Sequence, residues 1–405
     1  MPYNPISALI VSLDFGEEKI EVGHLIQKNR RIFFNYTPDF LKHQLQISPF
    51  KLPLAMALTT CEVSGFEGLH GVFNDSLPDG WGKLLLDRYM RTQGVMPQQL
   101  TPLDRLSFVG NNGMGALCYT PQYDLKHHAS EPVDLPKLEC ETHALLDGDT
   151  DTFFEELLRL NGSSHGARPK ILAEVSHDKT KILSKRKKTE ETDSWLIKFK
   201  SVQDPDDNGA IEYAYSLMAK EAGLHMPETY LFNNRYFGVK RFDCDVKKRH
   251  HMHTLSGLLH ADYRIPNLDY KDALKATQLL TKSAKDIQSH FKLAVFNVLA
   301  HNRDDHGKNT AYLMDQSGVW HLAPAYDLTF SYGPAGEQSM TIMGEGKNPA
   351  ETHLIKLAQA YDIQNAKEII EVVQATINKW PSIAKNAGVT KTSTTLIKNS
   401  LKFFK

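Results

Sequence analysis

An apolar helical pattern near the end of the chain leads directly into a strongly polar loop. Apolar side chains recur at the spacing of one helix face: Ile287, Phe291, Ala294, Val295, Val298 and Leu299. The next residues, "AHNRDDHGKN" at 300–309, bring together two carboxylates, two histidines, two cations and two asparagines. Two short apolar runs around a "DQSG" turn follow and predict a β-hairpin. This order predicts a mixed α and β fold around a loop with catalytic potential.

The composition excludes several classes of protein. With 405 residues and a formal net charge of -1, the chain can bury a large core but has no overall charge that attracts nucleic acid or anionic membranes. The N-terminal residues lack the basic flank of a signal peptide, and no apolar run has the length of a membrane span. The cysteines are far apart and without CxxC spacing, which argues for reduced thiols. We therefore expect a cytoplasmic protein.

The chain is predicted to have three parts and an α+β fold. Residues 1–125 contain β-type runs such as "ISALIVSL" and "RRIFFNY", with one helix after "SLPDGW". Residues 126–243 begin with a helix capped by Thr150 or Asp151, followed by the strands "PKILAEVS", "SWLIKFK", "TYLFNN" and "YFGVKRF" and a second helix. Residues 244–405 have mainly helical periodicity.

The polar loop has the spacing of a phosphotransferase site. Asp304 and Asn309 form D-x-x-x-x-N, the separation of the catalytic carboxylate and the metal-binding amide in kinases. In the predicted hairpin Thr310 lies roughly opposite Ala323, which brings Asn309 close to Asp327. Carboxylate and amide oxygens are ligands for Mg²⁺. The alternative, a solvated connection rich in turn-forming residues, stays open on this segment alone.

A kinase also needs a strand lysine that holds phosphates. Strand alternation places Lys198 and Leu196 on one face, opposite a face formed by Trp195, Ile197 and Phe199. The expected helix partner of Lys198 is Glu212. The alternatives are a solvent-exposed edge lysine and a glutamate that complements the helix dipole.

The segment "NGSSHGARPK" at 161–170 is the candidate phosphate loop. It contains G-x-S-x-G around Ser164, but a helix precedes the serine and a strand follows it, the reverse of the order in a hydrolase nucleophile elbow. It also lacks the G-K-[S/T] ending of a Walker A loop. A loop of small residues with Lys170 at its strand end can still hold phosphates through backbone amides.

In combination, these segments resemble the HipA family of bacterial serine/threonine kinases, the toxins of type II toxin–antitoxin pairs. The resemblance covers nearly the whole chain through the motifs "FNDSLPDGWGKLLLDR", "GARPK", "WLIKF", "IEYAY", "GVKRFD", "LSGLL", "FNVLAHNRDDHGKN" and "LAPAYDL". It implies a HipA-like protein kinase fold, with a β-rich N-terminal subdomain at 1–125, an α+β small lobe at 126–243 and an all-α catalytic lobe at 244–405.

The resemblance implies roles for the residues that match the family motifs. Asp304 would be the catalytic base, and Asn309 and Asp327 would hold Mg²⁺. Lys198 would contact the phosphates of ATP, assisted by Lys170.

The motif "KRFD" would form the hinge of the nucleotide site. Lys240 and Phe242 would frame the adenine, and Asp243 would accept a hydrogen bond from the ribose. His306 has two open roles, an approach to the phosphates or a bracing contact within the loop. The histidines of "KKRHHMH", residues 250, 251 and 253, suggest a metal cluster, but we expect a solvated loop there.

The resemblance also implies regulation and partners. Ser163 would be autophosphorylated, although Ser164 offers a second acceptor beside it. A HipB-like antitoxin would bind DNA, so this chain would contact DNA only indirectly, and an aminoacyl-tRNA synthetase is the expected type of protein substrate. Two alternatives stay open: a small-molecule kinase of the aminoglycoside-phosphotransferase type, which would not explain "SLPDGW", and a non-catalytic corepressor scaffold.

Overall fold

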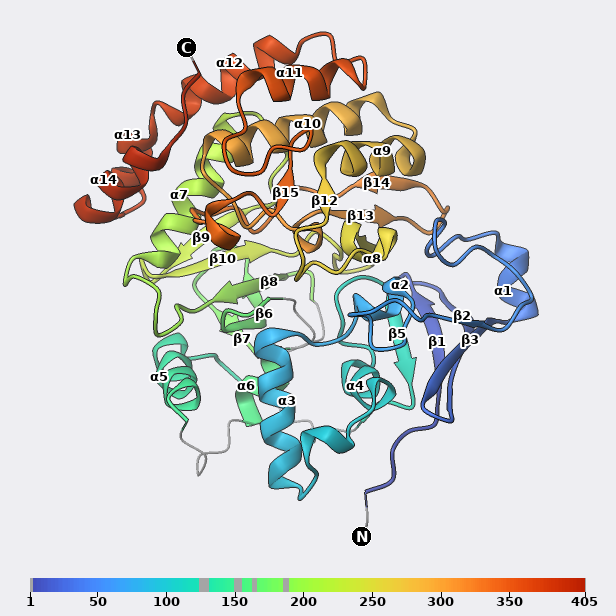
Figure 1. Cartoon of the computed structure of the whole chain (residues 1–405). Helices are drawn as coiled ribbons and strands as arrows, with labels where there is room; N and C mark the ends of the chain where they lie inside the picture. Colours follow the sequence, from blue (N-terminus) through green and yellow to red (C-terminus); the bar gives the residue numbers. More distant parts are fainter. Residues whose placement is uncertain (1–2, 124–130, 149–154, 162–165, 185–188, 405) are drawn as a thin grey trace. The chain divides into compact units, whose positions relative to one another are not determined.

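The computed structural model describes residues 3–123, 131–148, 155–161, 166–184 and 189–404 (Figure 1). It divides into two compact units. Unit 1 comprises Met1–Asp204, Gly238–Met252 and Met314–Gly318, and unit 2 comprises Pro205–Phe237, His253–Leu313 and Val319–Lys405. Residue 125, a predicted boundary, lies within unit 1, in the sequence between β5 of the first large sheet and β6 of the second.

The first sheet confirms the predicted β-rich N-terminal region. Its strand order is β4-β3-β2-β1-β5, with β1 at Ala8–Asp14, β2 at Lys19–Lys28, β3 at Arg31–Tyr36, β4 at Thr59–Thr60 and β5 at Leu117–Thr120. Alternate residues of β1 (Leu9, Val11, Leu13) are fully buried, as the alternating pattern requires. The helices of this region are α1 (Pro38–His43), α2 (Gly71–Asn74), α3 (Gly80–Thr92) and α4 (Pro102–Val109).

The second sheet has the order β7-β6-β8-β10-β9. Its strands are β6 (Lys170–Ser176), β7 (Ile182–Leu183), β8 (Thr192–Lys198), β9 (Thr229–Phe232) and β10 (Tyr236–Lys240). Helix α6 (Glu155–Asn161) ends at the predicted residue and buries Leu157 and Leu158, whereas its predicted N-terminal caps lie outside the described residues. Helix α5 (Leu135–Leu146) was not predicted.

Helices are the predominant secondary structure of unit 2. They are α7 (Asn208–Glu221), α8 (Leu255–Leu259), α9 (Tyr270–Thr281), α10 (Ala284–Leu299), α11 (Glu351–Gln359), α12 (Ala366–Ile377), α13 (Trp380–Asn386) and α14 (Lys391–Ser400). Helix α10 buries the predicted apolar face, including Phe291, Ala294 and Val295. None of the helices in the described part of the chain combines the length and the apolar character of a bilayer span.

The C-terminal part is not all-α, because short strands accompany its helices. Strands β11 (His251–Thr254), β13 (Ala311–Met314) and β14 (Trp320–Leu322) form one sheet, and β12 (Leu268–Asp269) pairs in parallel with β15 (Met340–Thr341). The expectation of a solvated loop at "KKRHHMH" was also wrong. His251 and His253 are fully buried in β11, and His251 Nε2 lies 2.8 Å from the carbonyl of Ile47.

Candidate functional site

Two buried lysines lie side by side in the second sheet. Strands β6 and β8 are antiparallel, and their register places Lys170 directly opposite Lys198. Residues at opposite positions of such a ladder share one face of the sheet. Their side chains are only 4% and 8% exposed. Two cations at paired, buried positions suit a ligand with several negative charges.

The two faces of this sheet differ in burial, as the sequence predicts. Trp195 and Ile197 on β8 are completely buried on the face that packs into the core. Leu196 lies on the lysine face and is half-buried, as are its cross-strand neighbours Leu172 and Val239. The lysine face therefore carries an apolar patch next to paired cations, a combination suited to the base and phosphates of a nucleotide.

The structure describes residues 166–170, the C-terminal end of the candidate phosphate loop. The turn that opens α3 holds this end. Asp79 accepts a hydrogen bond from the Gly166 amide at 2.6 Å, and the Trp81 amide donates to the Gly166 carbonyl at 3.3 Å. The Trp81 indole N–H donates to the Lys170 carbonyl at 3.2 Å. The sequence motif "SLPDGWGK" drew attention to this turn but gave no sign of its contacts. Ser163 and Ser164 lie outside the described residues.

The motif "KRFD" is arranged differently from the expectation. Lys240 pairs with Trp195 across β10 and β8, so its side chain lies on the face opposite to Lys198, and its Nζ is 2.8 Å from an oxygen of Asp193. This placement does not support a side-chain contact with adenine. Phe242 is half-buried.

Asp243 is engaged in a buried ion pair. Arg241 donates to both of its carboxylate oxygens at 3.0 and 2.6 Å, and the Gly115 amide donates at 2.7 Å. Burial acts to raise the pKa of Asp243, but Arg241 and the amide outweigh it and hold the pKa at about 2. With no exposed surface, this carboxylate ties residues 113–115 to the end of β10 and does not present itself to a ribose.

The polar loop after α10 exposes one carboxylate. The Asp304 side chain is 59% exposed, and His306 Nε2 lies 3.8 Å from its Oδ1. The Asn309 side-chain amide donates to the Asp304 carbonyl at 2.6 Å, which turns the Asn309 oxygen away from the backbone of the loop. His306 therefore lies beside Asp304 within the loop, and both roles considered for it stay predictions.

The neighbouring carboxylate, Asp305, is buried and anchors the loop. Its oxygens accept hydrogen bonds from the Tyr270 hydroxyl at 2.8 Å, the Gln338 side-chain amide at 3.0 Å, and the backbone amides of Ser339 and Met340 at 2.8 and 3.3 Å. Burial raises the pKa of Asp305 to about 6, although these hydrogen bonds act to lower it. Sequence analysis selected Asp304 by its spacing from Asn309 but did not predict that Asp305 is a buried anchor.

Asp327 follows the predicted hairpin and approaches the loop. The Ala323 amide donates to Ala311 at 2.9 Å, one residue from the predicted register. The Tyr326 hydroxyl donates to the Lys308 carbonyl at 2.5 Å, so the residues next to Asp327 and Asn309 are in contact. Asp327 has φ +57, a left-handed conformation that is uncommon for residues with a side chain. Asp304, Asn309 and Asp327 belong to unit 2, whereas the paired lysines belong to unit 1.

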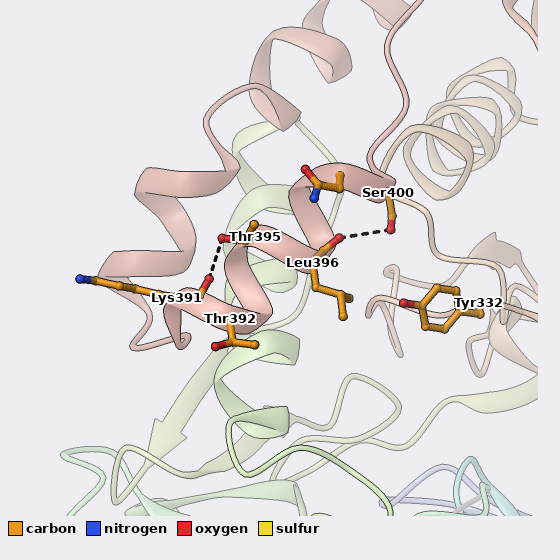
Figure 2. A pocket seen from close by; sticks show the side chains of 7 residues that line it. Tyr332, Lys391, Thr392, Thr395, Leu396 and Ser400 are labelled. Atoms are coloured by element: carbon orange, nitrogen blue, oxygen red, sulfur yellow. Dashed lines mark hydrogen bonds between the residues drawn. The ribbon is translucent and has the colours of Figure 1, made fainter.

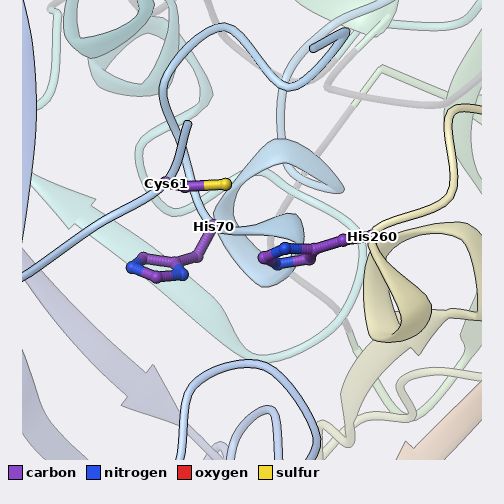
Figure 3. A group of neighbouring side chains, drawn as sticks. All are labelled: Cys61, His70 and His260. Atoms are coloured by element: carbon purple, nitrogen blue, oxygen red, sulfur yellow. The ribbon is translucent and has the colours of Figure 1, made fainter. Parts of the chain in front are cut away.

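Two other features contain no predicted site residue. A pocket between Tyr332 and α14 is lined by Leu396 and by polar side chains of that helix, and the hydroxyls of Thr395 and Ser400 bond to backbone carbonyls of the helix itself (Figure 2). In unit 1, Cys61 Sγ and a ring nitrogen of His70 lie within 4.8 Å of each other (Figure 3). Burial lowers the pKa of His70 to about 4 and raises that of Cys61, so both are uncharged at neutral pH.

The chain is similar to two family models. Residues 16–120 match the model described as HipA N-terminal domain, and residues 162–380 match the HipA-like C-terminal domain. No curated protein matches the chain.

Among solved structures, a chain of the Shewanella oneidensis MR-1 toxin–antitoxin complex of HipA, HipB and operator DNA is similar. It is 16% identical with a TM-score of 0.67, and the match covers 96% of this chain and 94% of that one. The Helicobacter pylori proinflammatory kinase CtkA gives a TM-score of 0.34 at 15% identity, over 52% of this chain and 88% of that one. The first likeness confirms the predicted α+β fold.

Proposed function

Because the chain belongs to the HipA family, we propose that it is an ATP- and Mg²⁺-dependent serine/threonine protein kinase. The observation that carries the proposal is the loop after α10. It exposes Asp304, fixes the neighbouring Asp305 by four buried hydrogen bonds, and lies in contact with the residue before Asp327. A rigid support under one exposed carboxylate is what a catalytic base requires.

In this proposal the polar residues of unit 2 carry the chemistry. Asp304 accepts a hydrogen bond from the acceptor hydroxyl, orients it and takes its proton. The Asn309 amide oxygen and the Asp327 carboxylate form a donor set that fits Mg²⁺. When bound, Mg²⁺ supplies charge neutralisation at the phosphates.

In unit 1 the lysine face serves the nucleotide. Lys170 and Lys198 bind phosphate oxygens, and the half-buried Leu172, Leu196 and Val239 contact the base. Lys240 and Asp243 are omitted from this assignment because their side chains are committed to Asp193 and Arg241.

We further propose that the kinase is the toxin of a toxin–antitoxin pair. The structurally similar complex from Shewanella oneidensis contains HipA, HipB and operator DNA, which supports a HipB-like, DNA-binding antitoxin as the partner. The substrate class that follows from the family is a translation component such as an aminoacyl-tRNA synthetase.

The test of the proposed activity is incubation of the purified chain with labelled ATP, Mg²⁺ and cell lysate. A labelled protein, identified by mass spectrometry, supports the protein kinase. Label only in small molecules would favour the aminoglycoside-phosphotransferase type of activity. No transfer to any acceptor, from a chain that binds the antitoxin, would favour the corepressor scaffold.

We predict that this chain alone does not bind DNA specifically. Its formal net charge of -1 provides no excess of cations for phosphate contacts. In a mobility-shift assay, operator DNA should shift with the antitoxin and shift further when this chain is added. A specific, salt-sensitive shift by the chain alone would contradict the prediction.

We predict autophosphorylation in the segment before Gly166, at Ser163 or Ser164. A phosphate adds about two negative charges close in sequence to Lys170, where the phosphates of ATP are proposed to bind. ATP affinity should therefore fall when the segment is fully modified. Mass spectrometry after incubation with ATP should find the mark, and the Asp304→Asn variant should lack it. A fully phosphorylated chain that binds ATP as tightly as the unmodified one would refute the inhibitory effect.

A further inference from the structure

An aspartate at the start of α3 has an unusual hydrogen-bond partner. Asp79 is the N-cap residue of α3, a position where an aspartate normally accepts a bond from the first turn of its own helix. Here its side chain makes no such bond and instead accepts from the amide of Gly166, 87 residues away, at 2.6 Å. The side chain is 8% exposed. Its cap function has been exchanged for a contact with the phosphate-loop segment.

Neighbouring residues of the same turn reinforce this contact. Gly80 has φ +40, and a Cβ there would lie 2.5 Å from the Ala167 Cα, so the backbones of the turn and the segment approach as closely as glycine allows. Trp81 bonds to Gly166 through its backbone and to the Lys170 carbonyl through its indole. The segment from Gly166 to Lys170 is therefore held at both ends.

The held segment fixes the position of Lys170, which is proposed to bind the phosphates of ATP. A Cβ at Gly166 would lie 2.3 Å from the Lys170 Nζ, so the ammonium group lies directly beside the Gly166 backbone. Gly166 itself has φ +106, which other residues rarely adopt. A shift of Gly166 would therefore change the surroundings of the Lys170 ammonium, and Lys170 pairs with Lys198 in the strand register.

We propose that Asp79 is a positioning residue for ATP binding, an inference that rests on the proposed nucleotide site. It holds Gly166 so that Lys170 is presented beside Lys198, and it does not touch the nucleotide itself. Its removal should weaken ATP binding and leave the proton transfer at Asp304 intact.

The test compares Asp79→Ala and Asp79→Asn with a matched cap variant, Asp134→Ala. Asp134 caps α5 in the same unit and accepts a bond from its own helix, the Lys137 amide, at 3.1 Å. Loss of a hydrogen bond to a charged group should raise the Kd and KM for ATP on the order of tenfold or more in Asp79→Ala. We expect kcat at saturating ATP to change little. Asp79→Asn keeps an acceptor oxygen without its charge and should lose less affinity, on the order of severalfold, so this smaller loss is the result to test if Asp79→Ala fails to fold.

Hydrogen exchange provides a readout that does not depend on activity. The Gly166 amide should exchange faster in Asp79→Ala than in the wild-type chain, and at the wild-type rate in Asp134→Ala. Wild-type ATP affinity in Asp79→Ala, a loss confined to kcat, or an equal loss in Asp134→Ala would overturn the inference. A wild-type chain that binds no ATP would refute the proposed function instead, and the exchange rates would still decide whether Asp79 holds Gly166.

Discussion

Replacing Asp304 by asparagine should reduce phosphoryl transfer by at least about a hundredfold while leaving the fold intact. A positioned general base typically contributes this much, and asparagine cannot accept the proton. The side chain is 59% exposed, and its closest ion-pair contact is His306 at 3.8 Å, so the substitution removes little that stabilises the loop. Transfer of labelled phosphate and the thermal unfolding midpoint are the two measurements.

Asp327→Asn should have a comparable effect on activity, because it removes a charge from the proposed Mg²⁺ ligands. The matched control is Asp362→Asn. Asp362 is exposed and has φ +55, nearly the same left-handed backbone as Asp327 at φ +57, and asparagine is tolerated in this conformation. The control should retain wild-type activity.

A well-folded Asp304→Asn protein that still transfers phosphate would remove the catalytic assignment from this loop.

Local patterns in the sequence were sufficient to predict the elements that carry the candidate site. Strand alternation correctly separated Lys198 and Leu196 from Trp195 and Ile197, because successive side chains of any strand point to opposite faces. Helical periodicity likewise predicted the buried face of α10. In both cases the information lies within a few residues of the position in question.

The features that were missed depend on contacts between distant segments. The bond between Asp79 and Gly166 joins residues 87 apart, and that between Asp305 and Ser339 joins residues 34 apart. The D-x-x-x-x-N spacing selects Asp304, but the burial of Asp305 is not visible in the sequence, because it is set by Tyr270 and the segment at 338–340. Asp243 was assigned to a ribose although its main partner, Arg241, lies only two residues away, because the sequence does not show that this pair is buried; only the bond from Gly115, 128 residues away, is a long-range contact.

Replacing Asp305 by alanine should have the largest effect on stability. The carboxylate satisfies the hydroxyl of Tyr270, the side-chain amide of Gln338 and two backbone amides, all of them buried. Each donor left without an acceptor costs about 1–3 kcal/mol and four donors are affected, so we expect a loss of at least about 4 kcal/mol in the free energy of unfolding of unit 2. Activity should fall as well, because the loop that carries Asp304 loses its support.

Asp305→Asn separates the charge from the hydrogen bonds, since its amide oxygen can still accept from the backbone of Ser339 and Met340. Burial raises the pKa of Asp305 from 3.8 to about 6, so the folded protein retains a proton that the unfolded chain releases between these values. The contribution of this carboxyl to stability is therefore fully present below about pH 4 and declines as the pH rises to about 6.

Unfolding free energies measured from pH 4 to 7 should show the wild-type chain losing stability relative to Asp305→Asn across this window and no further change above it. A difference that is constant from pH 4 to 7 would show that Asp305 is already ionised in the folded protein, and that hydrogen bonds alone, not a retained proton, hold the loop that carries Asp304.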